Sequence, residues 1–360
     1  MAHIMTVQGP IEPDTLGFTS MHEHVLYDGT VYFKRSEGKF PEDLPVKGDD
    51  PVRLDNIGLL QRNFTLCKDA CSMHDEEWMA AELAEFKEAG GQALVDQSAP
   101  GLRSDVLAIQ RLSKRTGVHI ITTTGLYTED SWPDEFKGMS RDEYVKYMLD
   151  EIENGIEDTG IKPGAIKIAV LDLTEQQEKA LRAAGRVANE SGLMLTVHPG
   201  FDIGNDGRRI VKILRQEGVD LGRVVIAHGD GFFVSTKLRE LILDPASWQM
   251  KVDYHKEILD QGANISIDCF GHQWASEIAG WIIEKDWHRL GGLVALIKEG
   301  YSPQMVLGTD TFIKILTRRG GGEGYCRLTR FVIPTLREVG VSDFDIRNMT
   351  QTNPARLLAH

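Results

Sequence analysis

The sequence predicts an α/β fold of the (β/α)8 TIM barrel class, with one domain over residues 6–360. Eight short apolar runs have the length of strands, each is followed by a helix-period stretch, and the chain length suits one barrel of about 250 residues plus insertions. Apolar strands that alternate with amphipathic helices indicate a parallel sheet covered by helices. A doubly wound open sheet is the alternative, but no Gly-x-Gly-x-x-Gly follows the first strand.

The predicted elements alternate along the whole chain. The strands are expected over residues 16–24, 91–98, 119–127, 164–171, 193–198, 224–230, 263–270 and 305–310. Helices after the first five strands are expected over residues 76–89, 104–116, 140–154, 174–191 and 207–217. Ser104 is the expected N-cap of the second helix, and Ser140 with Glu143 forms a capping-box pattern at the third.

Three connections are longer than usual for such a barrel. Residues 27–75 follow the first strand, 231–260 the sixth and 311–324 the eighth. All three leave the carboxyl ends of strands, where barrel enzymes keep their active sites, so we expect lid insertions that shape a substrate pocket rather than surface decoration. Residues 1–5 lack the basic and apolar regions of a signal peptide, and we expect them to be a cloning remnant before a native start at Met5.

Composition limits the choice of partners. The chain has 40 Lys and Arg against 54 Asp and Glu, a net charge of −14, which argues against nucleic acid and against an anionic membrane surface. No apolar run approaches the roughly 18 residues of a membrane span. Four scattered cysteines suit reduced thiols and a cytoplasmic protein. The expected partner is therefore a small-molecule substrate.

Metal-binding side chains end several predicted strands. His22 and His24 lie two residues apart, so both face the same side of the first strand. Other candidates are His198, His228 and Asp310 at the ends of the fifth, sixth and eighth strands, and Lys167 inside the fourth. In a closed barrel these positions converge at the carboxyl end. Imidazole and carboxylate ligands suit zinc, manganese, cobalt or iron(II), of which we expect zinc, with cobalt or manganese as alternatives. Four histidines with an aspartate fit two divalent ions better than one.

Lys167 is unusual because a lysine that points into an apolar barrel is costly unless it is paired or neutral. One interpretation is an ion pair with a nearby acid. The other is that its lowered pKa makes the amine nucleophilic, so that CO₂ converts it to a carbamate, which can bridge two cations. Asp310 can serve both as a ligand and as the proton acceptor when a hydroxide attacks a substrate.

From about Gly9 to its end, the chain resembles the phosphotriesterase family of the amidohydrolase superfamily. The matching segments are 17–24, 124–127, 164–167, 308–310 and 353–358, together with His198 and His228. The resemblance implies a buried metal on His22, His24 and Asp310 and a more exposed metal on His198 and His228. It also implies that carboxylated Lys167 and a hydroxide bridge the two ions, and it suggests a homodimer.

The resemblance also assigns residues around the metals. Tyr127 matches an aromatic residue that lies over the metals and is tyrosine in lactonase-like members; it is a candidate catalytic donor to an oxyanion, or else a packing residue at the barrel rim. Family phosphotriesterases carry a histidine after the aspartate of the seventh strand, whereas Cys269 follows Asp268 here. Asp230 is a candidate substitute in proton transfer, or a residue that orients His228.

Substrate contacts are expected from the last long connection, where Arg318 and Arg319 could clamp an anionic group or remain solvated. The insertion over residues 27–75 resembles that of larger phosphotriesterase-related proteins, which include amide-cleaving members; some of those carry glutamate at the position where this chain keeps Lys167. The predicted function is hydrolysis of a carboxylic ester or lactone. Phosphotriester hydrolysis, N-acyl amide hydrolysis and a catalytically inactive binding barrel are the alternatives.

Overall fold

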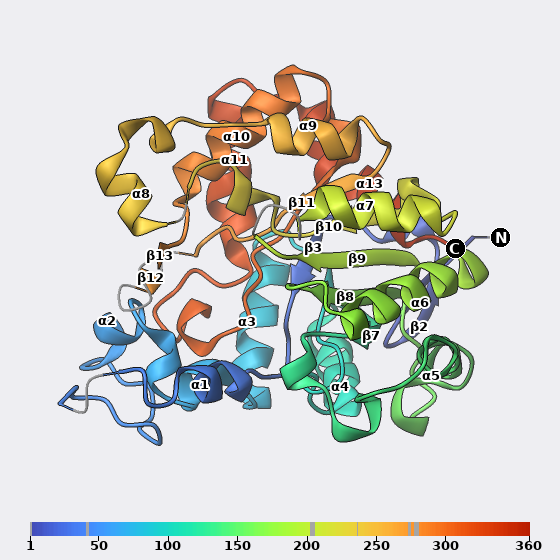
Figure 1. Ribbon diagram of the computed structural model, residues 1–360, viewed down its shortest axis with the longest axis horizontal. Helices are drawn as coiled ribbons and strands as arrows, with labels where there is room; N and C mark the ends of the chain where they lie inside the picture. Colours follow the sequence, from blue (N-terminus) through green and yellow to red (C-terminus); the bar gives the residue numbers. More distant parts are fainter. Residues whose placement is uncertain (1, 41–42, 202–205, 236, 273–274, 277–280) are drawn as a thin grey trace.

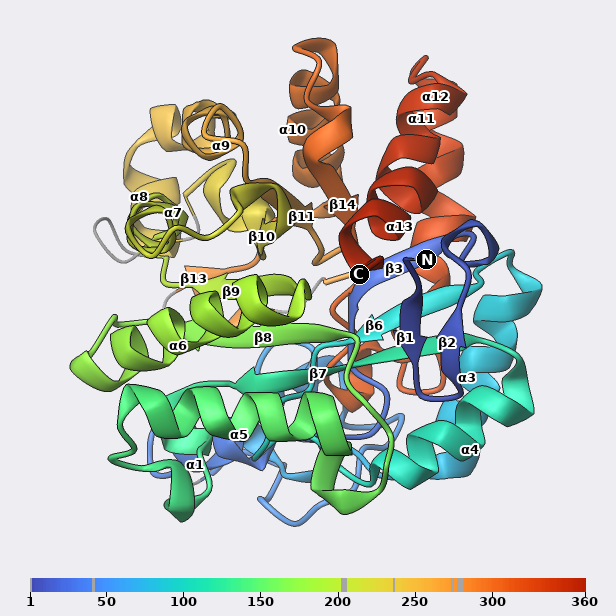
Figure 2. The same cartoon turned by 90° about the vertical axis from the view of Figure 1, so that its right-hand side faces the viewer.

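Eight parallel strands form the centre of the molecule, seen here in a computed structural model that describes residues 2–40, 43–201, 206–235, 237–272, 275–276 and 281–360. The sheet order is β14-β11-β10-β9-β8-β7-β6-β3. The strands are β3 (Thr19–Glu23), β6 (Ala93–Asp96), β7 (His119–Leu126), β8 (Ala165–Val170), β9 (Met194–Pro199), β10 (Val224–Ile226), β11 (Asn264–Ile267) and β14 (Met305–Leu307). Helices surround them (Figure 2), which confirms the predicted (β/α)8 barrel.

The barrel nearly closes between β14 and β3, the two ends of the sheet order. The backbone N–H of Asp310 donates a hydrogen bond of 2.9 Å to the carbonyl of His22. Gly308 permits this close approach, because a Cβ at that position would lie 2.9 Å from both the Cβ and the carbonyl oxygen of His22. The first and last strands therefore meet at the residues that the sequence analysis assigns to a metal.

The outer helices follow the predicted order. They are α3 (Glu76–Glu88), α4 (Val106–Thr116), α5 (Arg141–Asn154), α6 (Glu175–Ser191), α7 (Gly207–Gln216), α9 (Asp253–Leu259), α10 (Asp286–Lys298), α11 (Ile333–Glu338), α12 (Asp343–Arg347) and α13 (Asn353–Leu358). The capping box at Ser140 is confirmed. The predicted cap of α4 is wrong: Asp105 accepts the N–H of Leu107, and α4 begins one residue later than expected, because the carboxylate fills the capping position.

A short hairpin covers the amino-terminal end of the barrel (Figure 2). Strand β1 (Ile4–Thr6) pairs antiparallel with β2 (Gly9–Ile11). The Ile4 side chain is fully buried in an apolar cluster with Leu16 and Leu357. Ile4 and Met5 are therefore part of the folded domain, outside the boundary at residue 6 that the sequence suggested.

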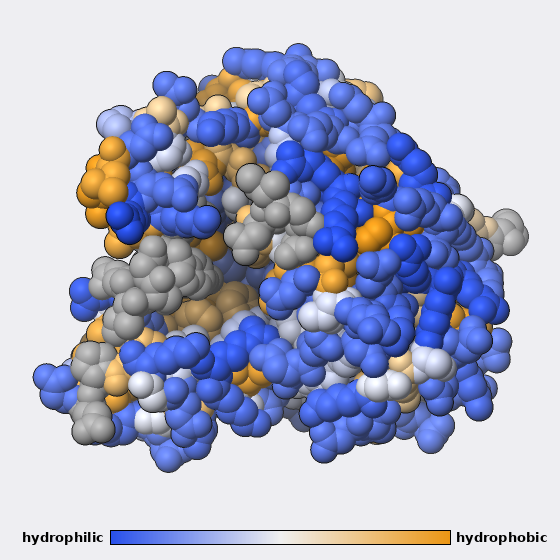
Figure 3. Space-filling view, in the orientation of Figure 1, coloured by the Kyte–Doolittle hydropathy of each residue, from blue (hydrophilic) through white to orange (hydrophobic). Residues whose placement is uncertain are grey.

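The long connections gather at the opposite end of the barrel (Figure 1). Residues 27–75 carry α1 (Thr30–Ser36), α2 (Ile57–Leu60) and the pair β4 (Tyr27–Asp28) and β5 (Ser72–Met73), and residues 231–260 carry α8 (Leu238–Leu243). The connection after β14 joins the first insertion through an ion pair between Lys314 and Asp69. The space-filling view shows a hollow with apolar residues between the parts that carry α8 and α1 (Figure 3). Within the described ranges, no helix has the length and apolar character needed to cross a membrane.

Candidate metal centre

The six predicted metal ligands come from five different strands or from the residues just after them. His22 and Lys167 lie within β3 and β8, and His198 lies within β9. His228 and Asp310 lie beyond the ends of β10 and β14, with left-handed backbone φ angles of 55° and 44°. Such angles are uncommon for residues other than glycine, and they are found preferentially at functional sites.

One group of ligand atoms joins the first and last strands. The Nε2 atoms of His24 and His22 lie 3.2 Å and 3.6 Å from one carboxylate oxygen of Asp310. All three side chains are buried, and the Nδ1 atom of His24 is hydrogen-bonded to the hydroxyl of Ser98 at 2.8 Å. The two histidines therefore face the same point, as their spacing predicts.

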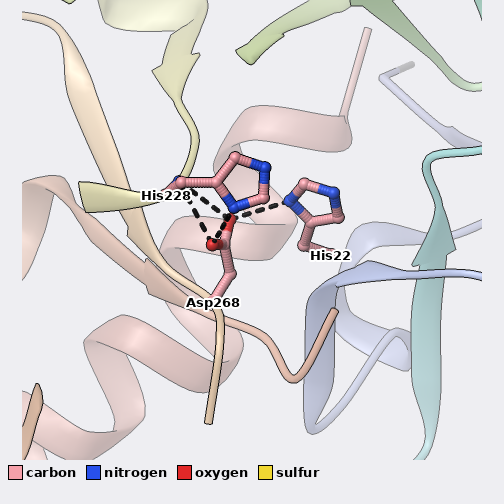
Figure 4. Close-up of side chains that lie close together, drawn as sticks. All are labelled: His22, His228 and Asp268. Carbon is pink, nitrogen blue, oxygen red and sulfur yellow. Dashed lines mark hydrogen bonds and ion pairs between the residues drawn. The ribbon is translucent and has the colours of Figure 1, made fainter. Parts of the chain in front are cut away.

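Asp268 connects two of the histidines (Figure 4). Its carboxylate accepts hydrogen bonds from Nδ1 of His22 at 2.8 Å and from Nδ1 of His228 at 2.9 Å. Burial opposes ionisation of this carboxyl, but the neighbouring His228 and His22 hold its pKa well below the usual range. Because the ionised carboxylate can only accept, both histidines carry a proton on Nδ1, and in its neutral form each would present the lone pair of Nε2 to the site.

Sequence reasoning did not assign this role to Asp268. A signal was available, because Asp268 follows the seventh strand directly, as Asp310 follows the eighth within three residues. An acid at such a position can serve either as a ligand or as a partner of ligating histidines, and only the contacts distinguish the two.

Lys167 and His198 complete the cluster. Nζ of Lys167 lies 3.2 Å from Nε2 of His22, and Nδ1 of His198 lies 2.8 Å from Nε2 of His228. Burial lowers the pKa of Lys167 to about 8, and burial together with the Lys167 charge lowers the pKa of His22 to about 4. Burial and the neighbouring His228 hold the pKa of His198 well below its ordinary value.

These properties fit divalent cations. Neutral imidazoles are the form that binds a metal, and the Nε2 lone pairs converge with the ionised carboxylate of Asp310. The donor atoms of His22, His24 and Asp310 all lie within 4.8 Å of one another, as do those of His228, Cys269 and Asp310, and two further such groups include Asp268. Asp310 belongs to the first two groups, which suits two neighbouring ions.

Aromatic side chains lie beside the cluster. The ring of Tyr127 packs edge-on against His198 at a centroid distance of 5.5 Å, and its hydroxyl hydrogen-bonds that of Tyr32 in α1 at 2.7 Å. Phe201 lies 6.0 Å from His198 between ring centroids and keeps 51% of its surface exposed. The sequence analysis assigned no role to Tyr32 or Phe201, because both lie in connections between barrel elements, where no strand period shows the direction of a side chain.

Three further residues were predicted to lie near the substrate: Asp230, Arg318 and Arg319. Asp230 is buried and accepts the backbone N–H groups of Asp268 and Cys269, at 2.8 Å and 3.4 Å. Arg318 forms an ion pair with Glu85 of α3, and the backbone N–H groups of Arg318 and Arg319 donate to Glu82 of the same helix. The structure thus brings Asp230 next to the cluster through the backbone, and it anchors the two arginines on α3.

Known proteins share this architecture. The model of the phosphotriesterase family matches residues 2–358. A phosphotriesterase-related protein of Nematostella vectensis is 30% identical over 357 residues, 97% of this chain and 96% of that protein. An N-acetyltaurine hydrolase of Dictyostelium discoideum is 27% identical over 379 residues, 99% of this chain and 97% of that protein.

Two solved structures are similar over nearly the whole chain. A resiniferatoxin-binding protein from Rhodobacter sphaeroides has a TM-score of 0.87 and 27% identity, covering 99% of this chain and 94% of its own. A mutant PTE-like lactonase from Deinococcus radiodurans has a TM-score of 0.73 and 25% identity, covering 99% of both chains. Fold and site define a barrel with a cluster of histidines and acids at its carboxyl end that could hold metal ions. The chain belongs to the phosphotriesterase family, and it is a hydrolase of that family.

Proposed function

We propose that this protein is a binuclear metal-dependent hydrolase that acts on a carboxylic ester or a lactone. The observation that carries the proposal is the convergence of imidazole Nε2 atoms with Asp310 and Lys167 at the carboxyl end of the barrel. A structural role alone would not require a lysine and several histidines to be buried together, since burying such groups unpaired is costly.

The chain offers a ligand set for two ions, preferably zinc. His22, His24 and Asp310 would hold one ion, and His198 and His228 the other. Lys167 has a lowered pKa, so part of it is the neutral amine that reacts with CO₂, and its carbamate would supply a carboxylate to both ions. When bound, the ions would supply an activated water as the nucleophile and polarise the carbonyl oxygen of the substrate.

Two side chains have properties suited to the reaction. Burial opposes ionisation of Asp310, but His22 and His24 hold its pKa below the ordinary value, so that it stays ionised and can accept the proton of the nucleophile. Burial and the neighbouring Tyr32 raise the pKa of Tyr127 well above 10, so that its hydroxyl stays protonated and can donate to a developing oxyanion.

The choice of an ester or lactone rests on Tyr127 and on the exposed ring of Phe201, which offers an apolar contact beside His198. The similarity to a PTE-like lactonase supports it. Cleavage of an N-acyl amide is the second candidate, because relatives named N-acetyltaurine hydrolase match 99% of this chain, including the insertion over residues 27–75.

The test is a panel of lactones, an aryl ester, a phosphotriester and N-acetyltaurine, run on zinc-loaded protein with Lys167→Ala as the control. We expect the highest kcat/KM on the lactones or the ester, and loss of turnover with chelator. Highest activity on N-acetyltaurine would select the amide candidate. Equal rates for the wild type and the control across the panel would reject the mechanism, and tight ligand binding by metal-free protein without turnover would indicate a binding barrel.

A further inference from the structure

Glu23 lies between the two histidines of the first strand, and the proposed reaction gives it no role. Successive residues of a strand point to opposite sides, so its side chain faces away from His22 and His24. The side chain is 0% exposed. A buried carboxyl is costly unless its oxygens accept hydrogen bonds, so its partners indicate what it does.

Those partners lie on the connection after β14. One oxygen of Glu23 accepts the backbone N–H of Thr309 at 2.8 Å, and the other accepts the backbone N–H of Thr311 at 3.0 Å. The Thr309 hydroxyl contacts both oxygens, at 2.8 Å and 2.7 Å, and Ser20 donates a further hydrogen bond. One carboxylate therefore binds the residues on both sides of Asp310.

Asp310 itself has a strained backbone. Its φ of 44° lies in the left-handed region, which is unfavourable for a residue other than glycine and persists only where the surroundings hold it. Its own N–H donates to the carbonyl of His22 at 2.9 Å. Residues 22 and 23 thus accept three consecutive backbone N–H groups, those of residues 309, 310 and 311.

We propose that Glu23 is a positioning residue for Asp310: its carboxylate holds the backbone on both sides of Asp310 in the conformation that directs this side chain to His22 and His24. The inference rests on the proposed function, in which Asp310 is a metal ligand. Glu23 acts through the backbone and does not touch the ions.

Both oxygens of Glu23 matter in this arrangement. Each accepts one of the two backbone N–H groups that flank Asp310, whereas an amide has only one oxygen. In Glu23→Gln one of the two positions becomes an NH₂ group, which would face a backbone N–H. The variant keeps the size of the side chain but loses one of the two backbone hydrogen bonds beside Asp310.

The chain offers a matched control. Glu82 of α3 is 3% exposed and accepts the N–H groups of Arg318 and Arg319 at 3.0 Å and 3.2 Å, in the same connection after β14. Glu82→Gln therefore makes the same chemical change to a buried carboxyl that anchors the same segment, but at positions eight and nine residues after Asp310.

The experiment measures zinc dissociation constants by competition with a chromophoric chelator, and the absorption spectrum of the cobalt-loaded protein. We expect Glu23→Gln to weaken zinc binding at one or both sites by about 10- to 100-fold, the usual effect of losing a group that supports a metal ligand. We also expect it to change the cobalt spectrum. Glu82→Gln should match the wild type in both measurements. Equal metal binding in both variants, or equal losses, would overturn the inference.

Two further results separate the remaining cases. If the wild type itself binds no metal, the proposed function fails and this inference fails with it. If Glu23→Gln does not fold, Thr309→Val replaces it, because this change removes only the hydroxyl that contacts both carboxylate oxygens. We then expect zinc binding to weaken by a smaller factor than the one given for Glu23→Gln. Zinc binding equal to that of the wild type would overturn the inference.

Discussion

Asp268 shows how one residue can organise a whole centre. Its two oxygens accept from His22 and His228, which belong to different metals in the proposed arrangement. It also accepts the backbone N–H of His228 at 3.1 Å, so it supports the left-handed backbone of that residue as well as its ring. Loss of this carboxylate should therefore affect both metal sites together.

We expect Asp268→Ala to weaken zinc binding by about 10- to 100-fold at both sites. Alanine offers no acceptor, so the Nδ1–H groups of both His22 and His228 lose the partner that fixes their tautomer and ring orientation. Zinc titration with the chromophoric chelator measures this. Loss at one site only would show that Asp268 orients a single histidine.

The proposed carbamate at Lys167 makes a specific prediction about replacement. Lys167→Met removes every group at this position that could bridge two ions. We expect metal affinity and activity to fall by more than the about 10- to 100-fold that follows the loss of a group supporting a metal ligand. Lys167→Glu supplies a carboxylate directly, and we expect it to retain more metal than the methionine variant. Metal content and turnover measure both. Equal metal content in the two variants would argue for a structural lysine.

The pKa of Lys167 also predicts how metal uptake depends on pH. Burial lowers this pKa to about 8, and only the neutral amine reacts with CO₂, so the reactive fraction reaches one half near pH 8 and levels off only above it. We expect the rate of zinc reconstitution in bicarbonate to follow this curve in the wild type. In Lys167→Glu the rate should not depend on bicarbonate, and a bicarbonate dependence there would contradict the carbamate.

At the scale of elements, the hydrophobic pattern predicted each of the eight strands but not where it ends. Strands β10 and β14 end at Ile226 and Leu307. The residues that follow them include His228 and Asp310, whose left-handed backbone angles are incompatible with continued pairing in the sheet. Nothing in residue type marks these positions, since glycine is the usual residue there. The strain depends on partners such as Asp268 and Glu23, which are distant in sequence.

The contact between α1 and the end of β7 joins an insertion to the site. The hydroxyls of Tyr32 and Tyr127 share a hydrogen bond of 2.7 Å. We expect Tyr127→Phe to lower kcat by about 10²-fold with little change in KM, because the oxyanion loses a donor. Tyr32→Phe should have a smaller effect, and the double variant should be no worse than Tyr127→Phe alone. Steady-state kinetics decides this, and an additive loss would show that the two tyrosines act independently.

At the scale of the molecule, the sequence predicted the centre because barrel closure brings strand ends to one place, so strand positions alone select His22, His24, Lys167, His198, His228 and Asp310. That logic does not extend to loop residues. Arg318 was a candidate for the substrate, yet it pairs with Glu85 on α3, and Tyr32 was missed although it reaches Tyr127. A loop takes its direction from the surface it packs on, and sequence periodicity carries no information about that surface.

The whole fold should respond to metal removal, because the ligands come from the first, fourth, fifth, sixth and eighth strands of the barrel. Ions that bind only the folded state stabilise it, by about 2.7 kcal/mol at a free concentration 100 times the dissociation constant. Chelation should therefore lower the melting temperature of the wild type and leave that of Lys167→Met unchanged. Calorimetry with and without EDTA measures the difference. If chelation shifted both proteins equally, the stabilising ions would be bound outside this centre, and the barrel would not depend on metals to hold its strand ends together.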